Sequence, residues 1–262
     1  MSLFDFFRSI KTVFGLVTGR SKLASRSETG CLVVVMEKSR KYGSCPGAGL
    51  DGDRMAGLLR EYGDVIHLSD AGASGCAFKS ALQQVCRKEL AIVYYAGHGG
   101  RSKSGSSENG YSEHLCLDDG PFWDYEIWKT VSCASGRVVL IFDCCHSGHM
   151  YRHAGFEGEW AGVKYLHAEE LEPLYPGFEF SMLRTRAIAA GGHDILVWSG
   201  CPSESYSYGD SSGGVFTNGI LKGTSSVFAT YDSVWRSARK AASAQRPVRT
   251  VMGSGFSGPV FR

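Results

Sequence analysis

Short, nearly continuous runs of apolar residues recur along the chain, and each has the length of a β-strand. The clearest are CLVVVM (Cys31–Met36), AIVYYA (Ala91–Ala96) and RVVLIFD (Arg137–Asp143), followed by Asp194–Trp198 and the strand-like segment Asp64–Leu68. Runs rich in β-branched residues are typical of strands that are buried on both faces of a sheet. We therefore expect these segments to form a mostly parallel central sheet.

Between these runs, apolar residues recur at the helical spacing of three and four. The predicted helices are Asp51–Tyr62, a segment around Phe78, Leu82 and Val85, and the segments Val215–Lys222 and Tyr231–Gln245. Strands that alternate with helices indicate an α/β fold with helices on both faces of the sheet. In such folds the chemistry lies just beyond the carboxyl ends of the strands.

The first 29 residues follow a different pattern. Apolar residues recur in residues 1–20 as one stripe of a helix, and charged residues interrupt the apolar core that a signal peptide would need. The polar stretch Ser21–Thr29 then separates this helix from the first strand. We interpret residues 1–29 as an amphipathic arm and linker, which either packs on its own domain or makes a membrane or autoinhibitory contact. Residues 30–262 form one domain in this interpretation.

Composition narrows the function classes. The 262 residues carry 28 basic and 26 acidic side chains, so the charge gives no reason to expect a nucleic-acid partner. No apolar run approaches the length of about 18 residues that a membrane span requires. Nine cysteines, an odd number at irregular spacings, indicate reduced thiols rather than a disulfide scaffold. We therefore expect a cytoplasmic protein.

A histidine and a cysteine follow two of the predicted strands. Ala91–Ala96 continues into Gly-His-Gly with His98 at its centre, and Arg137–Asp143 continues into Cys-Cys-His-Ser-Gly with Cys145 second. Either residue alone would more often be structural. Together, an imidazole can take the proton of a thiol during attack and return it to the leaving amine. The backbone N–H groups of Gly99 and of the segment that begins at Cys145 are candidate oxyanion donors.

These motifs resemble those of a known family. YYAGHG (Tyr94–Gly99) and DCCHSG (Asp143–Gly148) resemble the two active-site motifs of metacaspases, which are caspase-like cysteine peptidases. The segment GLDGDRMAGLL resembles the family's first helix, and Ser199–Gly223 resembles the start of its small-subunit half. The resemblance implies a caspase-like fold with a large-subunit-like part at 30–150, a connecting loop at 151–192 and a small-subunit-like part at 193–262.

The same resemblance assigns roles to two residues. His98 is the general base and Cys145 the nucleophile, because the family's cysteine directly precedes His-Ser-Gly. Cys144 then occupies a variable position, with a redox or back-up role as the alternative to a structural one. The resemblance also implies a role in programmed cell death and a monomeric state.

Two aspartates are candidates for the substrate pocket. Asp143 lies two residues before the nucleophile, where caspases carry an uncharged glutamine in a pocket that accepts aspartate. An acidic residue there would instead favour lysine or arginine before the scissile bond, as in metacaspases. Asp53 is similar to a second pocket aspartate of the family. The alternative for Asp53 is an ordinary acid in the first turn of a helix, which complements the helix dipole.

Two further pocket positions depart from the family. Ala96 replaces a serine that is common before the family's Gly-His, which removes a hydroxyl from the pocket. Asp210 is a further substrate-binding candidate, but the segment Ser203–Ser212 has no clear match to the family's Ser-Ala-Asp, so its register stays open.

Metal binding is disfavoured on the sequence. Many metacaspases require calcium, which needs six to eight oxygen ligands. The acidic residues here are Asp118, Asp119, Asp124 and Glu126. However, Tyr125 stands where a second adjacent aspartate is expected, and the segment after the nucleophile is basic. Adjacent cysteines at a strand end also form a poor zinc site. We expect no metal and no cofactor.

Three functions remain open. The first is an endopeptidase that cleaves proteins after Arg or Lys and cleaves itself within Tyr151–Gly192, where Lys164, Arg184 and Arg186 offer basic sites. The second is a catalytically silent scaffold or binding module with the same fold. The third is a relative that cleaves after Asp or Asn.

Overall fold

Six strands form the central sheet of the computed structural model, which describes residues 25–103, 111–144, 194–201, 207–210 and 212–262. Their order is β13-β10-β9-β5-β1-β4. The strands span Thr29–Val35 (β1), Asp64–Ser69 (β4), Leu90–Ala96 (β5), Arg137–Asp143 (β9), Ile195–Ser199 (β10) and Val248–Met252 (β13). All neighbouring pairs are parallel except β10 and β13. The predicted α/β fold with a mostly parallel sheet is confirmed.

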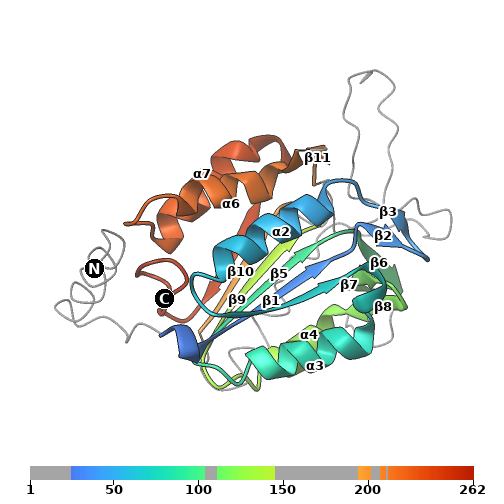
Figure 1. Ribbon diagram of the computed structural model, residues 1–262, viewed down its shortest axis with the longest axis horizontal. Coiled ribbons are helices and arrows are strands. Elements are labelled where there is room, and N and C mark those ends of the chain that lie inside the picture. The colour runs from blue at the N-terminus through green and yellow to red at the C-terminus, as the bar shows by residue number, and fades with distance from the viewer. Residues whose placement is uncertain (1–24, 104–110, 145–193, 202–206, 211) are drawn as a thin grey trace.

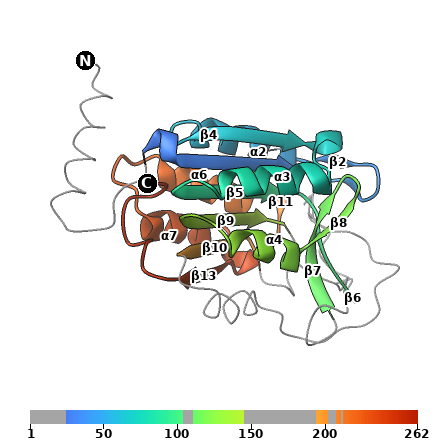
Figure 2. The same ribbon diagram turned by 90° about the horizontal axis from the view of Figure 1, so that it is seen from below.

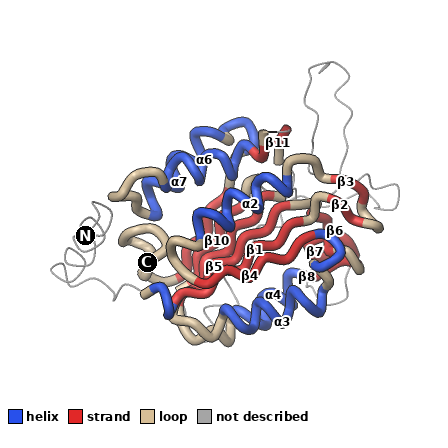
Figure 3. The backbone as a smooth tube through the Cα atoms, in the orientation of Figure 1, coloured by secondary structure: helices blue, strands red, loops and turns tan. Residues whose placement is uncertain are grey.

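Helices cover both faces of this sheet (Figures 1 and 3). On one face lie α2 (Ala48–Leu59), α6 (Val215–Thr224) and α7 (Tyr231–Ala241), and on the other lie α3 (Gly75–Val85) and α4 (Asp124–Val131). Successive residues of a strand point to opposite faces. Cys31 and Val33 of β1 accordingly join the core on the first face, whereas Leu32 and Val34 join the core on the second. Two buried faces explain why the strands are nearly continuous apolar runs.

Smaller strands were not foreseen. Figure 2 shows β6, β7 and β8 beside the central sheet. They form a three-stranded antiparallel sheet and span Gly99–Lys103, Tyr111–Leu117 and Gly120–Trp123. β6 forms although its sequence, GGRSK, has the glycine and polar composition typical of a loop. The remaining strands form two short antiparallel hairpins. One pairs β2 (Lys38–Ser39) with β3 (Gly43–Ser44), and the other pairs β11 (Gly209–Asp210) with β12 (Gly213–Gly214).

Some predicted boundaries move. The helix expected from Asp51 begins at Ala48. The segment Tyr231–Gln245 divides into α7 and a 3-10 helix, η3 (Ser243–Gln245). The other 3-10 helices are η1 (Arg26–Glu28) and η2 (Asp70–Gly72).

Part of the sequence interpretation concerns residues outside the described ranges. These are the amphipathic arm up to residue 24, the predicted nucleophile Cys145 and the whole connection 151–192. Among the helices that are described, none has the length and apolar character needed to cross a membrane.

The register of the strands brings selected residues together at the carboxyl edge of the sheet. Ala96 at the end of β5 pairs with Val35 of β1 on one side and with Asp143 of β9 on the other. Ser199 at the end of β10 pairs with Phe142. His98 thus lies two residues beyond Ala96, and Cys145 follows two residues after Asp143 in the chain.

Candidate active site

His98 is held by a backbone carbonyl. Its side chain follows β5 and is only 3% exposed, and its Nε2 lies 3.0 Å from the carbonyl oxygen of Ser44 at the end of β3. A carbonyl oxygen can only accept a hydrogen bond, so Nε2 must carry the proton. The neutral ring therefore keeps its basic lone pair on Nδ1, which is the nitrogen that can take a proton from a nucleophile.

The backbone around His98 is fixed by close packing. The His98 carbonyl accepts hydrogen bonds from the Tyr95 hydroxyl at 2.6 Å and from the Cys116 amide at 3.1 Å. Gly97 is required for this approach, because a Cβ at that position would lie 2.8 Å from both the Tyr95 hydroxyl oxygen and the Cβ of Met36. Burial raises the pKa of Tyr95 well above its usual value, so its hydroxyl remains a donor.

Asp143 is the buried acid at the end of β9. Its carboxylate accepts hydrogen bonds from the hydroxyls of Ser207 at 2.5 Å and Thr217 at 2.6 Å. Because Thr217 donates to Asp143, the Tyr94 hydroxyl, 2.7 Å from Thr217, must donate to Thr217 in turn. This chain of hydroxyls provides donors for a carboxylate that has no access to bulk water.

A second buried carboxylate lies nearby, and it belongs to Asp51. Both of its oxygens accept from the amide of Gly214, at 2.9 and 2.7 Å. Gly214 is the N-cap of α6, and Thr217 lies in the first turn of that helix. The two carboxylates therefore gather at one helix N-terminus, where the helix dipole favours negative charge. Gly213 has φ 102°, and a Cβ there would lie 2.2 Å from a carboxylate oxygen of Asp51.

Asp53 does not share this position. It is exposed on α2, whereas Asp51 is fully buried. Two residues along a helix correspond to a rotation of about 200°, so only one of the two acids can face the sheet. Asp51 is therefore the α2 acid that lies at the N-terminus of α6, and the substrate-binding role expected for Asp53 stays a prediction. A signal was present in the sequence, because Asp51 lies four residues before Met55 and eight before Leu59, on the same apolar face.

Of the remaining predicted site residues, three lie in the described part of the chain and one does not. Ala96 is buried beside Asp143, and Gly99 is buried at the start of β6. Asp210 lies in β11 and pairs with Gly213, close to the amide that holds Asp51. Cys145 lies outside the described residues, so its assigned role and its oxyanion role stay predictions.

Cys144 packs inside the protein. Its side chain is fully buried among the apolar residues on the α3 and α4 face, and its carbonyl accepts a hydrogen bond from the Cys201 thiol at 3.4 Å. A side chain with no solvent exposure is a poor target for oxidants. This placement favours the structural role over the redox role.

The acidic residues considered for calcium each support local structure. Asp118 forms an ion pair with Arg40, Asp119 accepts from the Gly75 amide at 2.8 Å, Asp124 accepts from the Tyr125 amide at 2.8 Å, and Glu126 lies 3.7 Å from Lys79. The ion pair with Arg40 lowers the pKa of Asp118. Within the described ranges, no three His, Cys, Asp or Glu side chains cluster as metal ligands would.

Three contributors to the site were not among the site residues predicted from the sequence. Ser44 acts through its backbone, and Ser207 and Thr217 reach Asp143 from the small-subunit-like part of the chain. Only the fold brings these groups together, over 64 and 74 residues of chain in the two hydroxyl contacts.

The comparisons with known proteins agree with this architecture. Residues 29–250 match the model of the caspase domain, so the chain belongs to this caspase-like peptidase family. Among solved structures, protein GSU0716 from Geobacter sulfurreducens is similar, with a TM-score of 0.68 and 18% identity over 89% of this chain and 98% of that one. Caspase-1 from Spodoptera frugiperda has a TM-score of 0.56 and 11% identity over 92% of each chain. A search of the curated proteins finds no match in sequence.

The family assignment confirms the caspase-like part of the resemblance, and the structural similarity to caspase-1 supports the caspase-like fold. A caspase-domain chain with a buried histidine at the end of β5 suggests a cysteine peptidase.

Proposed function

We propose that this protein is a metacaspase-like cysteine endopeptidase that cleaves after arginine or lysine, with Cys145 as nucleophile and His98 as base. The observation that carries the specificity is the pair of buried carboxylates, Asp143 and Asp51, at the carboxyl edge of the sheet. The donors that reach them include two hydroxyls at Asp143 and a backbone amide at Asp51. A guanidinium or ammonium group would bring the positive charge that such a pocket favours.

The strand register supports the dyad. Asp143 and Ala96 are directly paired, and neighbouring strands lie about 4.8 Å apart. His98 and Cys145 each follow two residues after these paired positions in the sequence, so the two motifs begin at neighbouring strand ends. The orientation of His98, with Nε2–H on the Ser44 carbonyl, leaves Nδ1 as the proton acceptor.

The reaction then has two halves. Nδ1 of His98 accepts the thiol proton while the sulfur of Cys145 forms a bond to the scissile carbonyl carbon, and the amides of Gly99 and Cys145 are the candidate donors to the oxyanion. As the C–N bond breaks, the imidazolium gives its proton to the leaving amine. In the second half, Nδ1 deprotonates a water that attacks the thioester, the C–S bond breaks, and the proton returns to sulfur.

A peptide panel tests the proposal. Fluorogenic peptides that end in Arg, Lys, Asn or Asp are assayed with the full chain, with and without calcium, beside the Cys145→Ala and His98→Ala variants. We expect turnover of the Arg and Lys peptides by the parent alone. Turnover of Asp peptides would refute the acidic pocket, and silence on every peptide would favour the scaffold function.

Self-processing is tested separately. We propose that the enzyme cleaves its own connection 151–192 after Lys164, Arg184 or Arg186. The parent and Cys145→Ala are expressed side by side, and the masses of the fragments are measured. Fragments that end at these residues are expected from the parent only, and identical fragments from both proteins would show that another protease makes the cuts.

A further inference from the structure

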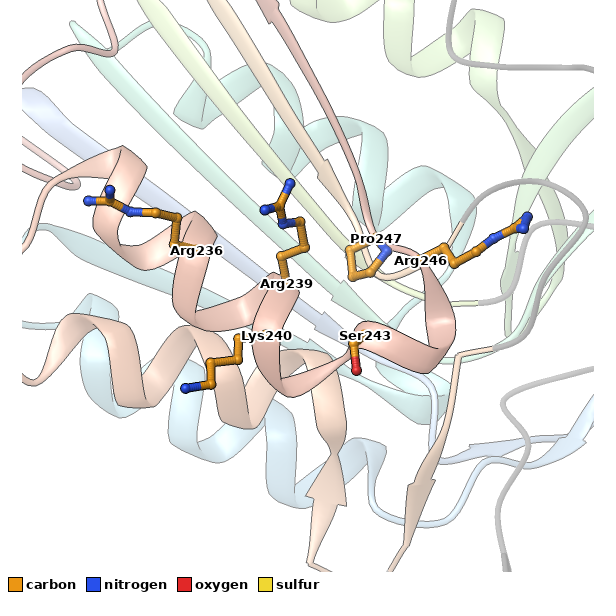
Figure 4. A pocket seen from close by; sticks show the side chains of 6 residues that line it. All are labelled: Arg236, Arg239, Lys240, Ser243, Arg246 and Pro247. Carbon is orange, nitrogen blue, oxygen red and sulfur yellow. The ribbon is translucent and has the colours of Figure 1, made fainter.

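Four cationic side chains line a cavity of about 700 Å³ at the end of α7 (Figure 4). They are Arg236, Arg239, Lys240 and Arg246, and Ser243 and Pro247 complete the lining. All four cations are exposed, and none of their side chains forms an ion pair or hydrogen bond with another residue that the structure describes. The nearby Asp232 is paired with Arg249 instead. Among the described residues, the cavity is thus a concentration of positive charge with no acid paired to it.

The positions of these cations are unfavourable for the protein alone. Arg236 lies three and four residues before Arg239 and Lys240, a spacing at which like charges on a helix repel each other. The helix dipole accounts for Arg239 and Lys240 in the last turn of α7, but not for Arg236 or for Arg246 beyond the helix. A gathering of charge that costs stability indicates that an anion binds there.

Arg246 adds an independent observation. It adopts a left-handed conformation, with φ 54° and ψ 58°, at the C-cap of η3. Glycine adopts this conformation without strain, whereas a residue with a Cβ does not. An arginine at such a position is consistent with a side chain that is needed there.

The cavity adjoins the acidic pocket through a short series of contacts. Gln245, which precedes Arg246, is 1% exposed and donates to the carbonyl of Tyr208 at 3.1 Å. Tyr208 follows Ser207, the residue that donates to Asp143. In addition, β13 begins directly after the cavity and pairs with the carboxyl end of β10. The cavity therefore lies at the same edge of the sheet as the candidate active site.

We propose that this cavity binds acidic residues of the substrate, a few positions away from the basic residue that enters the pocket of Asp143 and Asp51. The inference rests on the proposed function. It gives the enzyme two opposite charges to recognise, a cation at the scissile bond and carboxylates farther along the peptide. An extended peptide advances about 3.3 Å per residue, so a cluster of four acidic residues covers roughly 13 Å and can present several carboxylates to the four cations.

The test uses internally quenched peptides with one central Arg. One carries four Glu before the Arg, a second carries four Glu after it, and a third has Gln at all of these positions. We expect at least one Glu peptide to exceed the Gln peptide about tenfold in kcat/KM at low ionic strength, and the advantage to shrink in 0.5 M salt because exposed charges are screened. Equal kcat/KM values for all three peptides would overturn the proposal.

Matched variants test whether the preference for Glu peptides arises at the cavity. Arg239→Gln/Lys240→Gln removes two charges from the cavity, and Arg60→Gln/Arg87→Gln removes two exposed charges that follow α2 and α3 at the opposite edge of the sheet. The first variant should lose the preference for Glu while its turnover of a short Arg peptide is unchanged, and the second should keep both. An equal loss in both variants would mean that general charge attraction is responsible.

Arg246→Gly separates binding from stability. Relief of the left-handed strain should raise the melting temperature, while the preference for Glu falls. A variant that gains stability and keeps the full preference would exclude Arg246 from the site.

Failure of the proposed function has a different signature. If no peptide is cleaved, the binding of a fluorescein-labelled Glu peptide to the full chain is measured by fluorescence anisotropy. Binding that is weakened about tenfold in Arg239→Gln/Lys240→Gln, and unchanged in Arg60→Gln/Arg87→Gln, would support the acidic-peptide site without the peptidase. Equal affinity in both would overturn it.

Discussion

Buried ionisable groups lie on both sides of the end of β5, and the two sides treat them differently. Toward α6, the carboxylate of Asp143 accepts from two hydroxyls, and both oxygens of Asp51 share the amide N–H of Gly214. Toward the β6–β8 sheet, His114 is 7% exposed, and burial, with Lys41 as a lesser cause, lowers its pKa to about 4. Burial likewise raises the pKa of Cys116 far above that of an ordinary thiol.

The difference between the two sides shows that burial alone keeps an ionisable group neutral. A group that is removed from water without donors or counter-charges remains in its neutral form, as His114 and Cys116 do. A carboxylate that meets prepared donors can be buried as an anion. The acids Asp143 and Asp51 thus form the charged side of this comparison, and His114 and Cys116, which burial keeps neutral, form the uncharged side.

The largest expected effect comes from the charged side. Asp143→Asn keeps the size of the side chain and removes its charge, so we expect kcat/KM on Arg peptides to fall about 1,000-fold, which corresponds to about 4 kcal/mol of transition-state stabilisation. The measurement is initial-rate kinetics, with circular dichroism to show that the variant is folded. Activity within tenfold of the parent would contradict the role of Asp143.

The uncharged side is tested by pH. The pKa of His114 is about 4 in the folded protein and 6.5 as an unperturbed group, so the unfolded chain binds the proton first as pH falls. Its contribution to stability is present above pH 6.5 and is lost between pH 6.5 and 4, by about 3 kcal/mol. Urea midpoints of the parent and of His114→Leu are compared across this range, and the parent should lose more stability. Parallel pH profiles would refute the burial effect.

A comparison of Asp51 with Asp53 tests which of the two acids on α2 contributes to the recognition of Arg. Asp51→Asn should lower kcat/KM on Arg peptides about 30-fold, or about 2 kcal/mol, because it weakens the charge held at the N-terminus of α6. The exposed Asp53→Asn serves as the control and should change kcat/KM by less than twofold. The reverse order of the two effects would place Asp53 in the pocket.

The smallest effect is expected at Cys144. Cys144→Ala removes a buried thiol from an apolar core, so we expect a loss of about 1 kcal/mol in the free energy of unfolding and an unchanged kcat/KM. Urea denaturation and peptide kinetics measure the two quantities. A fall in kcat/KM beyond threefold would assign this residue more than a structural role.

The central fold was accessible from the sequence because its signals are local. β1, β5 and β9 are continuous apolar runs, and each was predicted to within about two residues of its bounds. The strands of the β6–β8 sheet escaped prediction because Gly and polar residues interrupt any alternation in β6, and β8 has only four residues. Antiparallel β13 was missed because it is short and only one of its five residues is buried.

The candidate site likewise has residues that local sequence signals predict and residues that only the folded chain brings together. His98 was found because it follows an apolar strand in a family motif, and the structure places it at the edge of the sheet where it was expected. The donors to Asp143 were not found, since Ser207 and Thr217 become neighbours of Asp143 only when β9, β10 and α6 pack together. Asp51 was overlooked because the motif directed attention to Asp53, although the helical period places Asp51 on the buried face of α2.

The atom that orients His98 is the carbonyl oxygen of Ser44, and every amino acid has one. The side chain of residue 44 is exposed, so many substitutions there would preserve the contact. The contact depends instead on the backbone path of the β2–β3 hairpin. Gly43 adopts φ 78° there, and since no atom lies near the place of a Cβ, the backbone conformation and not space is what favours glycine. A mutational scan would therefore report tolerance at the residue that makes the contact and sensitivity at its neighbour. The identity of residue 44 can therefore change while its carbonyl oxygen keeps His98 in the same orientation.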